Sequence, residues 1–203
     1  EKSLALISQL KAEGIKISHI DIGGGVGIAY NEEKTINIEQ YVRSVLDKVG
    51  DLEVILEPGR AIVGNAGIFV TQVEYLKQSG VKSFAIIDGA MNDLQRPSLY
   101  GSYHQAIAVE DNSEGTKDTW DLVGPICETG DFLAKDRELT LAQGDYIALM
   151  SAGAYGFVLS SNYNSRPRVA EVMVSGSSHA LVRKRETVGS LFENEFIFND
   201  KIN

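Results

Sequence analysis

Five peptides of this chain carry side chains that bind anions or transfer protons. They read IDIGGGVG (20–27), EPGR (57–60), MNDLQRPSLY (91–100), GPICETGD (124–131) and AGAYGFVLSSNYNSRPR (152–168). Glycine backbones, arginines and tyrosines hold phosphates and carboxylates, and a thiol or a carboxyl group moves protons. These residue types predict a site for an anionic ligand at which a proton is transferred.

The glycine run Gly23, Gly24 and Gly25 follows a β-branched stretch, residues 16–22. Glycines after a strand let backbone N–H groups approach an anion closely, as phosphate loops do. The run matches neither the Walker pattern nor the full dinucleotide fingerprint. We favour a phosphate-binding loop, and a tight strand-to-helix turn without a ligand is the alternative.

Glu57 and Arg60 lie in the polar loop that ends the next apolar stretch. A glutamate there can hold a heteroaromatic nitrogen in its protonated form, and an arginine can bind a carboxylate or phosphate through two parallel hydrogen bonds. An ion pair between the two residues around a turn is the alternative. Arg96 and Tyr100 lie on either side of Pro97, which pre-sets a turn and lets both side chains converge on one anion.

The one cysteine, Cys127, is followed by Glu128. The neighbouring negative charge opposes formation of a thiolate, so this thiol suits a proton donor better than a nucleophile. A buried structural cysteine is the alternative. The three histidines are scattered without metal-ligand spacing, which favours packed or surface roles, so no metal site is predicted.

The composition, 43% hydrophobic and 23% charged, is typical of a soluble globular protein. A net charge of −9 argues against a nucleic-acid partner, because such binding depends on neutralising phosphates. A single cysteine excludes an internal disulfide and indicates a reducing compartment, the cytoplasm. No apolar run reaches the ~18 residues that a membrane span needs, so no membrane association is expected.

Apolar periodicity predicts helices over 1–13 and 38–49 and strands over 16–22 and 52–56, an alternation that indicates parallel strands with crossover helices. From about residue 66 the pattern changes to short strands between turns, which is typical of an antiparallel sandwich or barrel. These strands are expected over 68–76, 83–88, 105–109, 120–125, 146–150 and 170–174, with a polar loop over 110–119, a turn over 139–145 and a short helix over 186–192.

We therefore divide the chain into an α/β part, residues 1–65, and an all-β part, residues 66–203. Two strands cannot close a parallel sheet, because edges and apolar faces remain uncovered. The first part is expected to be completed by sequence outside this chain or by another chain. The chain is therefore interpreted as a piece of a longer protein.

Five peptides, EPGR and longer versions of the other four, carry a resemblance to a known family. They are HIDIGGGVG, EPGR, DGAMNDLQRPSLYG, VGPICETGDFLA and AGAYGFVLSSNYNSRPRVAEV. Together they resemble the carboxyl-terminal half of the fold-type III pyridoxal-phosphate-dependent decarboxylases. The resemblance implies the last βα units of a (β/α)8, alanine-racemase-like barrel, followed by an antiparallel β-sandwich or barrel domain. RPSLY, CETGD and SNYNSRPR point to the branch that converts meso-diaminopimelate to L-lysine.

The resemblance also implies roles for individual residues. Glu57 would pair with the pyridine nitrogen of pyridoxal 5'-phosphate, and Cys127 would donate the proton that replaces carbon dioxide. Further contacts to the cofactor would come from Gly23, Gly24, Gly25, Gly59, Arg60 and Tyr155. The substrate would be bound by Arg60, Arg96, Tyr100, Glu128 and Tyr155. Cys127 would reach the cofactor of the second subunit of a homodimer, so each active site would be shared.

The family's Schiff-base lysine and its ring-stacking histidine lie in the amino-terminal half, and neither motif occurs in this sequence. The chain is therefore expected to carry half an active site and to be inactive alone. A related decarboxylase acting on carboxynorspermidine, ornithine or arginine is one alternative. A non-catalytic regulatory homologue that has lost the lysine is another.

Overall fold

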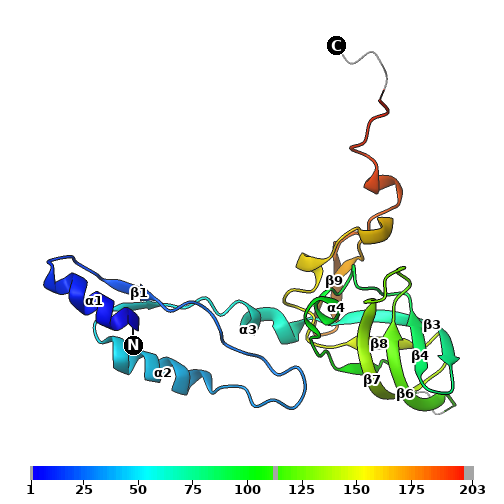
Figure 1. Cartoon of the computed structure of the whole chain (residues 1–203), viewed down its shortest axis with the longest axis horizontal. Helices are drawn as coiled ribbons and strands as arrows, with labels where there is room; N and C mark the ends of the chain where they lie inside the picture. The colour runs from blue at the N-terminus through cyan, green and yellow to red at the C-terminus, as the bar shows by residue number, and fades with distance from the viewer. Residues whose placement is uncertain (1, 112–113, 199–203) are drawn as a thin grey trace.

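A computed structural model describes residues 2–111 and 114–198, which form an extended N-terminal arm and a compact sheet domain (Figure 1). We call residues 2–59 the arm. It contains α1 (Lys2–Ala12), β1 (His19–Asp21), α2 (Ile38–Val49) and β2 (Glu53–Ile55). The short helix α3 (Arg60–Val63) and the 3-10 turn η1 (Gly64–Ala66) lead from the arm to the sheet domain.

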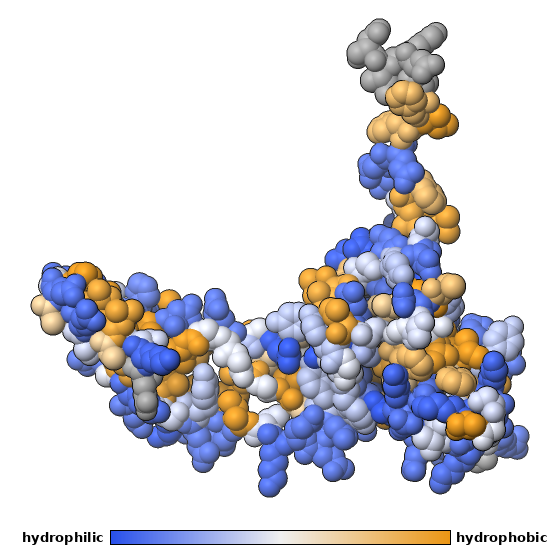
Figure 2. Space-filling view, viewed as in Figure 1, coloured by the Kyte–Doolittle hydropathy of each residue, from blue (hydrophilic) through white to orange (hydrophobic). Residues whose placement is uncertain are grey.

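The arm alternates helix and strand as the periodicity predicts. Its two strands pair in parallel, with Ile20 opposite Val54. Asn37 ends the preceding loop, and its side-chain oxygen caps α2 by accepting a hydrogen bond from the backbone N–H of Gln40. Neither helix contains a buried residue. Large apolar side chains such as that of Ile38 stay exposed, and Figure 2 shows apolar surface along the arm. Two strands and two helices therefore enclose little core.

Six strands form the sheet domain. They are β3 (Phe69–Gln78), β4 (Ser83–Ile87), β5 (Ala106–Ala108), β6 (Thr116–Val123), β7 (Phe132–Leu141) and β8 (Tyr146–Leu149), paired in the order β5-β8-β3-β4-β6-β7. The edge strands β5 and β7 also contact each other, so the sheet is nearly closed. Its interior is filled by fully buried side chains, among them Trp120, Leu122, Leu133 and Ile147. This packing supplies the rigid support for the loops at the strand ends.

The remaining elements are short. They are α4 (Arg96–Tyr100), the 3-10 turns η2 (Phe157–Leu159), η3 (Tyr163–Ser165) and η4 (Gly189–Leu191), and the strands β9 (Glu171–Ser175) and β10 (Ser178–Arg183). The helix α4 packs against β7, and β9 and β10 pair as an antiparallel hairpin outside the six-stranded sheet. Among the described residues, no helix combines the length and apolar composition that a membrane span requires.

Three expectations for the sheet domain are wrong. It is not wholly antiparallel, because β4 pairs with β6 in parallel. The turn expected over 139–145 overlaps β7, which continues to Leu141, and the polar loop expected over 110–119 overlaps the start of β6 at Thr116. Four successive charged residues, 135–138, interrupt the alternation of β7, and Asp136 has a positive φ of 55° where the pairing is irregular. A strand bent in this way loses the period of two that sequence analysis relies on.

Residues 60–68, which we call the connector, join the arm to the sheet domain and are held by two backbone hydrogen bonds. The backbone N–H of Gly153 donates to the carbonyl of Gly64 at 3.0 Å, and that of Ala152 donates to Gly67 at 2.7 Å. A Cβ on Gly153 would overlap the connector backbone at Val63, so this approach requires glycine. The loop after β8 is therefore held against the segment that follows the EPGR peptide.

Candidate active site

The glycine loop of the arm packs directly on the EPGR peptide. The backbone N–H of Glu57 donates to the carbonyl of Gly23 at 2.8 Å. A Cβ on Gly24 would overlap the carbonyl oxygen of Glu57, and Gly23 and Gly25 have positive φ values of 72° and 90°. Each glycine of the run therefore has a backbone reason to be glycine.

Gly59 and Tyr155 meet although they are 96 positions apart. Gly59 has a φ of +28°, and its Cβ position lies 3.9 Å from the Tyr155 hydroxyl. Tyr155 itself adopts the left-handed region, with φ 58°, in the loop that is fixed to the connector. A non-glycine residue there is uncommon, and such backbone positions cluster at functional sites. The side chain of Glu57 is exposed beside this meeting point.

The guanidinium of Arg60 lies near two tyrosine rings. Its guanidinium carbon is 5.4 Å from the ring centroid of Tyr155 and 6.0 Å from that of Tyr30. Its Nε is buried and, within the described residues, has no hydrogen-bond partner. A buried N–H without a partner is costly, so an anionic ligand would satisfy it. This unpartnered donor, in the peptide on which the glycine loop packs, fits a phosphate.

Arg96 is a second cation near the same ring, and it is only 6% exposed. Its guanidinium carbon lies 4.7 Å from the ring centroid of Tyr30, and its Nη1 is 3.0 Å from Nε2 of His104. His104 is fully buried, and burial lowers the pKa of its imidazole, reinforced by the charges of Arg96 and Arg137. Tyr100 ends the same short helix, but its side chain is 68% exposed.

Cys127 and Glu128 lie in the loop between β6 and β7. Cys127 is exposed, which contradicts the alternative of a buried structural cysteine. Glu128 accepts a hydrogen bond from the hydroxyl of Tyr163 at 3.3 Å, and its charge raises the pKa of that tyrosine. Asp131 fixes the loop by accepting from the backbone N–H groups of Ile126, at 2.8 Å, and Met91, at 2.6 Å.

The structure thus gathers most of the predicted residues in one cluster and leaves the others apart. The glycine loop, Glu57, Gly59, Arg60 and Tyr155 meet, and Arg96 joins them through Tyr30. Within the described residues, no side-chain hydrogen bond or ring contact links the Cys127–Glu128 loop or Tyr100 to this cluster. The chain therefore presents a cluster of glycine backbone, two arginines and two tyrosines and, separately, the exposed thiol of Cys127, which precedes Glu128 in the sequence.

Comparison with known proteins decides the family. The sequence model described as "Pyridoxal-dependent decarboxylase, C-terminal sheet domain" matches residues 17–153, more than half of the chain. The chain belongs to this family. Its nearly closed sheet is accordingly the C-terminal sheet domain of a pyridoxal-dependent decarboxylase.

Individual relatives within the decarboxylase family are closely similar. Diaminopimelate decarboxylase of Vibrio cholerae is 54% identical over 200 residues, covering 97% of this chain and 48% of the relative. The Pseudomonas aeruginosa enzyme of the same name is 51% identical over 197 residues, covering 96% and 47%. The crystal structure of diaminopimelate decarboxylase from Helicobacter pylori complexed with L-lysine superposes with a TM-score of 0.87 at 39% identity, covering 94% of this chain and 48% of that one. The chain spans about half the length of these relatives.

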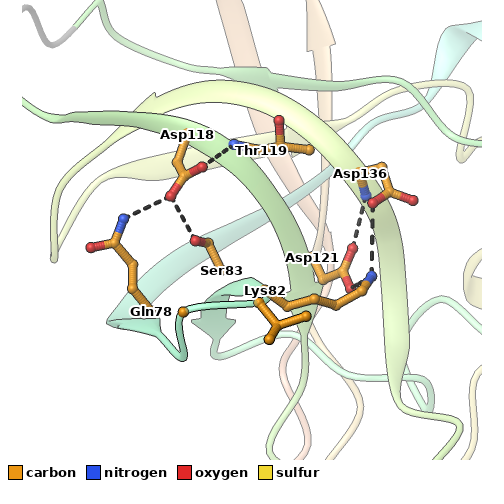
Figure 3. Close-up of a pocket in the computed structure, with 9 residues that line it drawn as sticks. Gln78, Lys82, Ser83, Asp118, Thr119, Asp121 and Asp136 are labelled. Carbon is orange, nitrogen blue, oxygen red and sulfur yellow. Dashed lines mark hydrogen bonds and ion pairs between the residues drawn. The ribbon is translucent and has the colours of Figure 1, made fainter.

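This pyridoxal-dependent decarboxylase domain has a hollow of about 490 Å³ at the β3–β4 turn (Figure 3). Lys82 binds the buried Asp121 at 2.7 Å across it, and Asp118 accepts hydrogen bonds from Ser83 and Gln78. Its polar groups therefore satisfy one another, and none of the predicted site residues lines it. Within residues 2–111 and 114–198, no group of His, Cys, Asp and Glu is arranged to hold a metal ion.

Sequence reasoning missed two residues of the cluster. Tyr30 follows the glycine run in an irregular segment, and the scattered spacing of the histidines predicts only a packed or surface role for His104. Neither belongs to a motif with a chemical meaning of its own. Their importance shows only in three dimensions, because Tyr30 contacts both arginines and His104 contacts Arg96.

Proposed function

We propose that the complete protein, of which this chain forms about half, decarboxylates meso-diaminopimelate to L-lysine with pyridoxal 5'-phosphate. Relatives bearing the name diaminopimelate decarboxylase, at 54% and 51% identity, support this substrate. The observation that carries the proposal is the cluster itself, in which a glycine loop, Glu57, Tyr155 and a cation with an unsatisfied buried N–H meet.

The cofactor phosphate would be held by the backbone of Gly23–Gly25 and Gly59, with Arg60 and Tyr155 beside it. Such backbone cradles and arginines bind phosphates well. When bound, the cofactor supplies an electron sink for the pair of electrons left by departing carbon dioxide. The carboxylate of Glu57 would hold a proton at the pyridine nitrogen, which strengthens that sink. The lysine that attaches the cofactor would come from the other half of the protein, so this chain alone would be inactive.

The substrate end that does not react would be bound by charge. Arg96 and Arg60 would bind the distal carboxylate together with Tyr100, and Glu128 would bind the distal ammonium group. Meso-diaminopimelate carries an amino acid group at each end, and only one end loses its carboxylate. Binding energy at the remote end would orient the reacting end, so that the correct bond is broken.

The thiol of Cys127 would complete the reaction. The bond from the α-carbon to the carboxylate breaks, carbon dioxide leaves, and Sγ donates a proton to that carbon. The exposed position of Cys127, away from the cluster of its own chain, supports a shared site in which it serves the second subunit of a homodimer. The protein would act in the cytoplasm, without a nucleic-acid or membrane partner.

Residues 1–65 would be the last βα units of a (β/α)8 barrel, and residues 66–203 the sheet domain. Parallel pairing of β1 with β2 and the exposed apolar side chains of the arm support this division. In such barrels the loops after the strands carry the chemistry. The glycine loop and the EPGR peptide follow β1 and β2 in this way.

A substrate panel tests the proposed function. The full-length protein with cofactor would be offered meso-diaminopimelate, ornithine, arginine and carboxynorspermidine, and carbon dioxide release measured. We expect turnover of meso-diaminopimelate alone. Turnover of ornithine without turnover of diaminopimelate would refute the substrate, and absence of cofactor binding would support a non-catalytic homologue.

Mixed dimers test the shared site. Cys127→Ala and Glu57→Gln, each in the full-length protein, would be nearly inactive alone. If Cys127 serves the partner's cofactor, a mixed dimer contains one site with both native residues, and mixing restores part of the activity. If Cys127 serves its own subunit, every site in the mixture keeps one substitution and activity stays low.

A further inference from the structure

Arg96 is a buried cation whose neighbours are a ring and an imidazole. Its side chain contacts His104 and the face of Tyr30, and the ion pairs of the described residues include no carboxylate at Arg96. Burial of an unneutralised guanidinium is unfavourable unless hydrogen bonds and an anion compensate it. The contacts that hold this cation in place therefore matter for any anion that binds it.

The geometry around His104 fixes which ring nitrogen carries the proton. Nδ1 lies 2.8 Å from the carbonyl oxygen of Met150, which can only accept, so Nδ1 carries the proton. Nε2 is then a lone-pair acceptor, and Nη1 of Arg96 donates to it at 3.0 Å. If both ring nitrogens carried protons, the N–H groups of His104 Nε2 and Arg96 Nη1 would both be donors only 3.0 Å apart, which is unfavourable.

The surroundings of His104 favour the same neutral form. Arg96 faces Nε2, and Arg137 approaches from β7, where its Nη2 donates to the backbone carbonyl of His104 at 3.2 Å. The ring of Tyr30 contacts the imidazole edge-on at 5.3 Å. Two cations and complete burial all oppose a positive charge on the ring.

Tyr30 connects the two arginines. Its ring centroid is 4.7 Å from the guanidinium carbon of Arg96 and 6.0 Å from that of Arg60. Its backbone is anchored, because Glu33 accepts from the N–H of Tyr30 at 3.0 Å and the carbonyl of Ala29 accepts from Asn65 at 3.0 Å. Its hydroxyl is buried without a partner among the described residues, so the ring is the part that makes contacts.

We infer that His104 and Tyr30 are positioning residues, which hold Arg96 so that its remaining N–H groups face a carboxylate of the substrate. This inference rests on the proposed function. His104 sets the orientation of the guanidinium through one hydrogen bond, and Tyr30 sets its place relative to Arg60. Neither residue touches the reacting atoms.

Binding and rate measurements on full-length variants test the inference. Removing a charge-assisted hydrogen bond or a cation–π contact is expected to weaken substrate binding about tenfold. We expect His104→Leu and Tyr30→Leu each to raise KM for meso-diaminopimelate about tenfold, with kcat and cofactor affinity nearly unchanged. His104→Gln, whose amide oxygen can accept from Arg96, and Tyr30→Phe, which keeps the ring, are matched controls that should stay within about threefold of the wild type. Equal losses in Tyr30→Phe and Tyr30→Leu, or no change in KM for both leucine variants, would overturn the inference.

A spectroscopic test needs neither substrate nor activity. Nitrogen-15 NMR of the histidine rings in the full-length protein should show His104 neutral at pH 7, with the proton on Nδ1. An imidazolium or the opposite tautomer would overturn the inferred orientation of Arg96. Because this measurement uses the wild-type protein, it tests the inference even if a leucine variant does not fold. If the wild type neither binds nor converts diaminopimelate, the proposed substrate fails while the tautomer result stands.

Discussion

Substitution of Gly24 by alanine is predicted to weaken cofactor binding in the full-length protein. The added Cβ would overlap the carbonyl oxygen of Glu57, a backbone atom that cannot move without displacing the EPGR peptide. Insertion of one methyl group into such a contact costs about 1–3 kcal/mol. Because about 1.4 kcal/mol corresponds to tenfold, the affinity for pyridoxal 5'-phosphate should fall about 5- to 150-fold.

Gly27→Ala is the matched control. Gly27 lies in the same segment, its Cβ position has nothing within 4 Å, and its backbone does not lie in the left-handed region. Cofactor titration followed by absorbance should therefore give an affinity within about twofold of the wild type for this variant. Thermal unfolding of both variants separates loss of binding from loss of folding. Unchanged cofactor affinity in Gly24→Ala would refute the close packing of the glycine loop on Glu57.

Three further predictions concern other parts of the molecule. Cys127→Ala should slow turnover at least about a hundredfold with KM little changed, because the role proposed for the thiol is to donate a proton and not to bind the substrate; equal turnover would exclude it as donor. Arg96→Lys should raise KM for meso-diaminopimelate about tenfold despite the retained charge, because an ammonium cannot both donate to His104 and bind a carboxylate in the same plane. Arg168 binds Glu186 through two hydrogen bonds, which hold the pKa of that carboxyl at about 2, below its ordinary 4.5. This pair stabilises the fold above pH 4.5 and loses its contribution as the pH falls toward 2, so Glu186→Gln should lower Tm at pH 7 but not at pH 2.

Most of the elements could be predicted because their periodicity is local. The helix expected over 38–49 is observed with those bounds, since Tyr41, Val45 and Val49 recur at helical spacing and Asn37 caps the start. The strands β3, β4, β5 and β8 begin and end within about two residues of expectation for the same reason. Of the β9–β10 hairpin, the sequence predicts only the first strand, over 170–174. Every residue of β10 is exposed, so no burial pattern marks it.

The candidate site could be predicted only in part, because its residues come from separate loops. Glycines 23–25, Glu57 and Arg60 carry recognisable chemistry in the sequence, and their proximity follows from two adjacent parallel strands. The sequence does not distinguish Arg96 from Tyr100, yet Arg96 is 6% exposed and Tyr100 68%. Tyr30 carries no local signal at all. Its role depends on contacts to Arg60 and Arg96, which no spacing in the sequence specifies.

The distribution of ion pairs gives an independent reason to expect an anion in the cluster. The chain has 28 acidic and 19 basic residues, so carboxylates are abundant. Several surface cations pair with them, as Arg43 does with Glu39 and Arg183 with Glu171. Within the described residues, however, Arg60 and Arg96 pair with rings and an imidazole, in a partly buried place where a carboxylate would stabilise them more than at the surface. Two uncompensated cations at one point of a protein with net charge −9 lower its stability unless a phosphate or a carboxylate binds there.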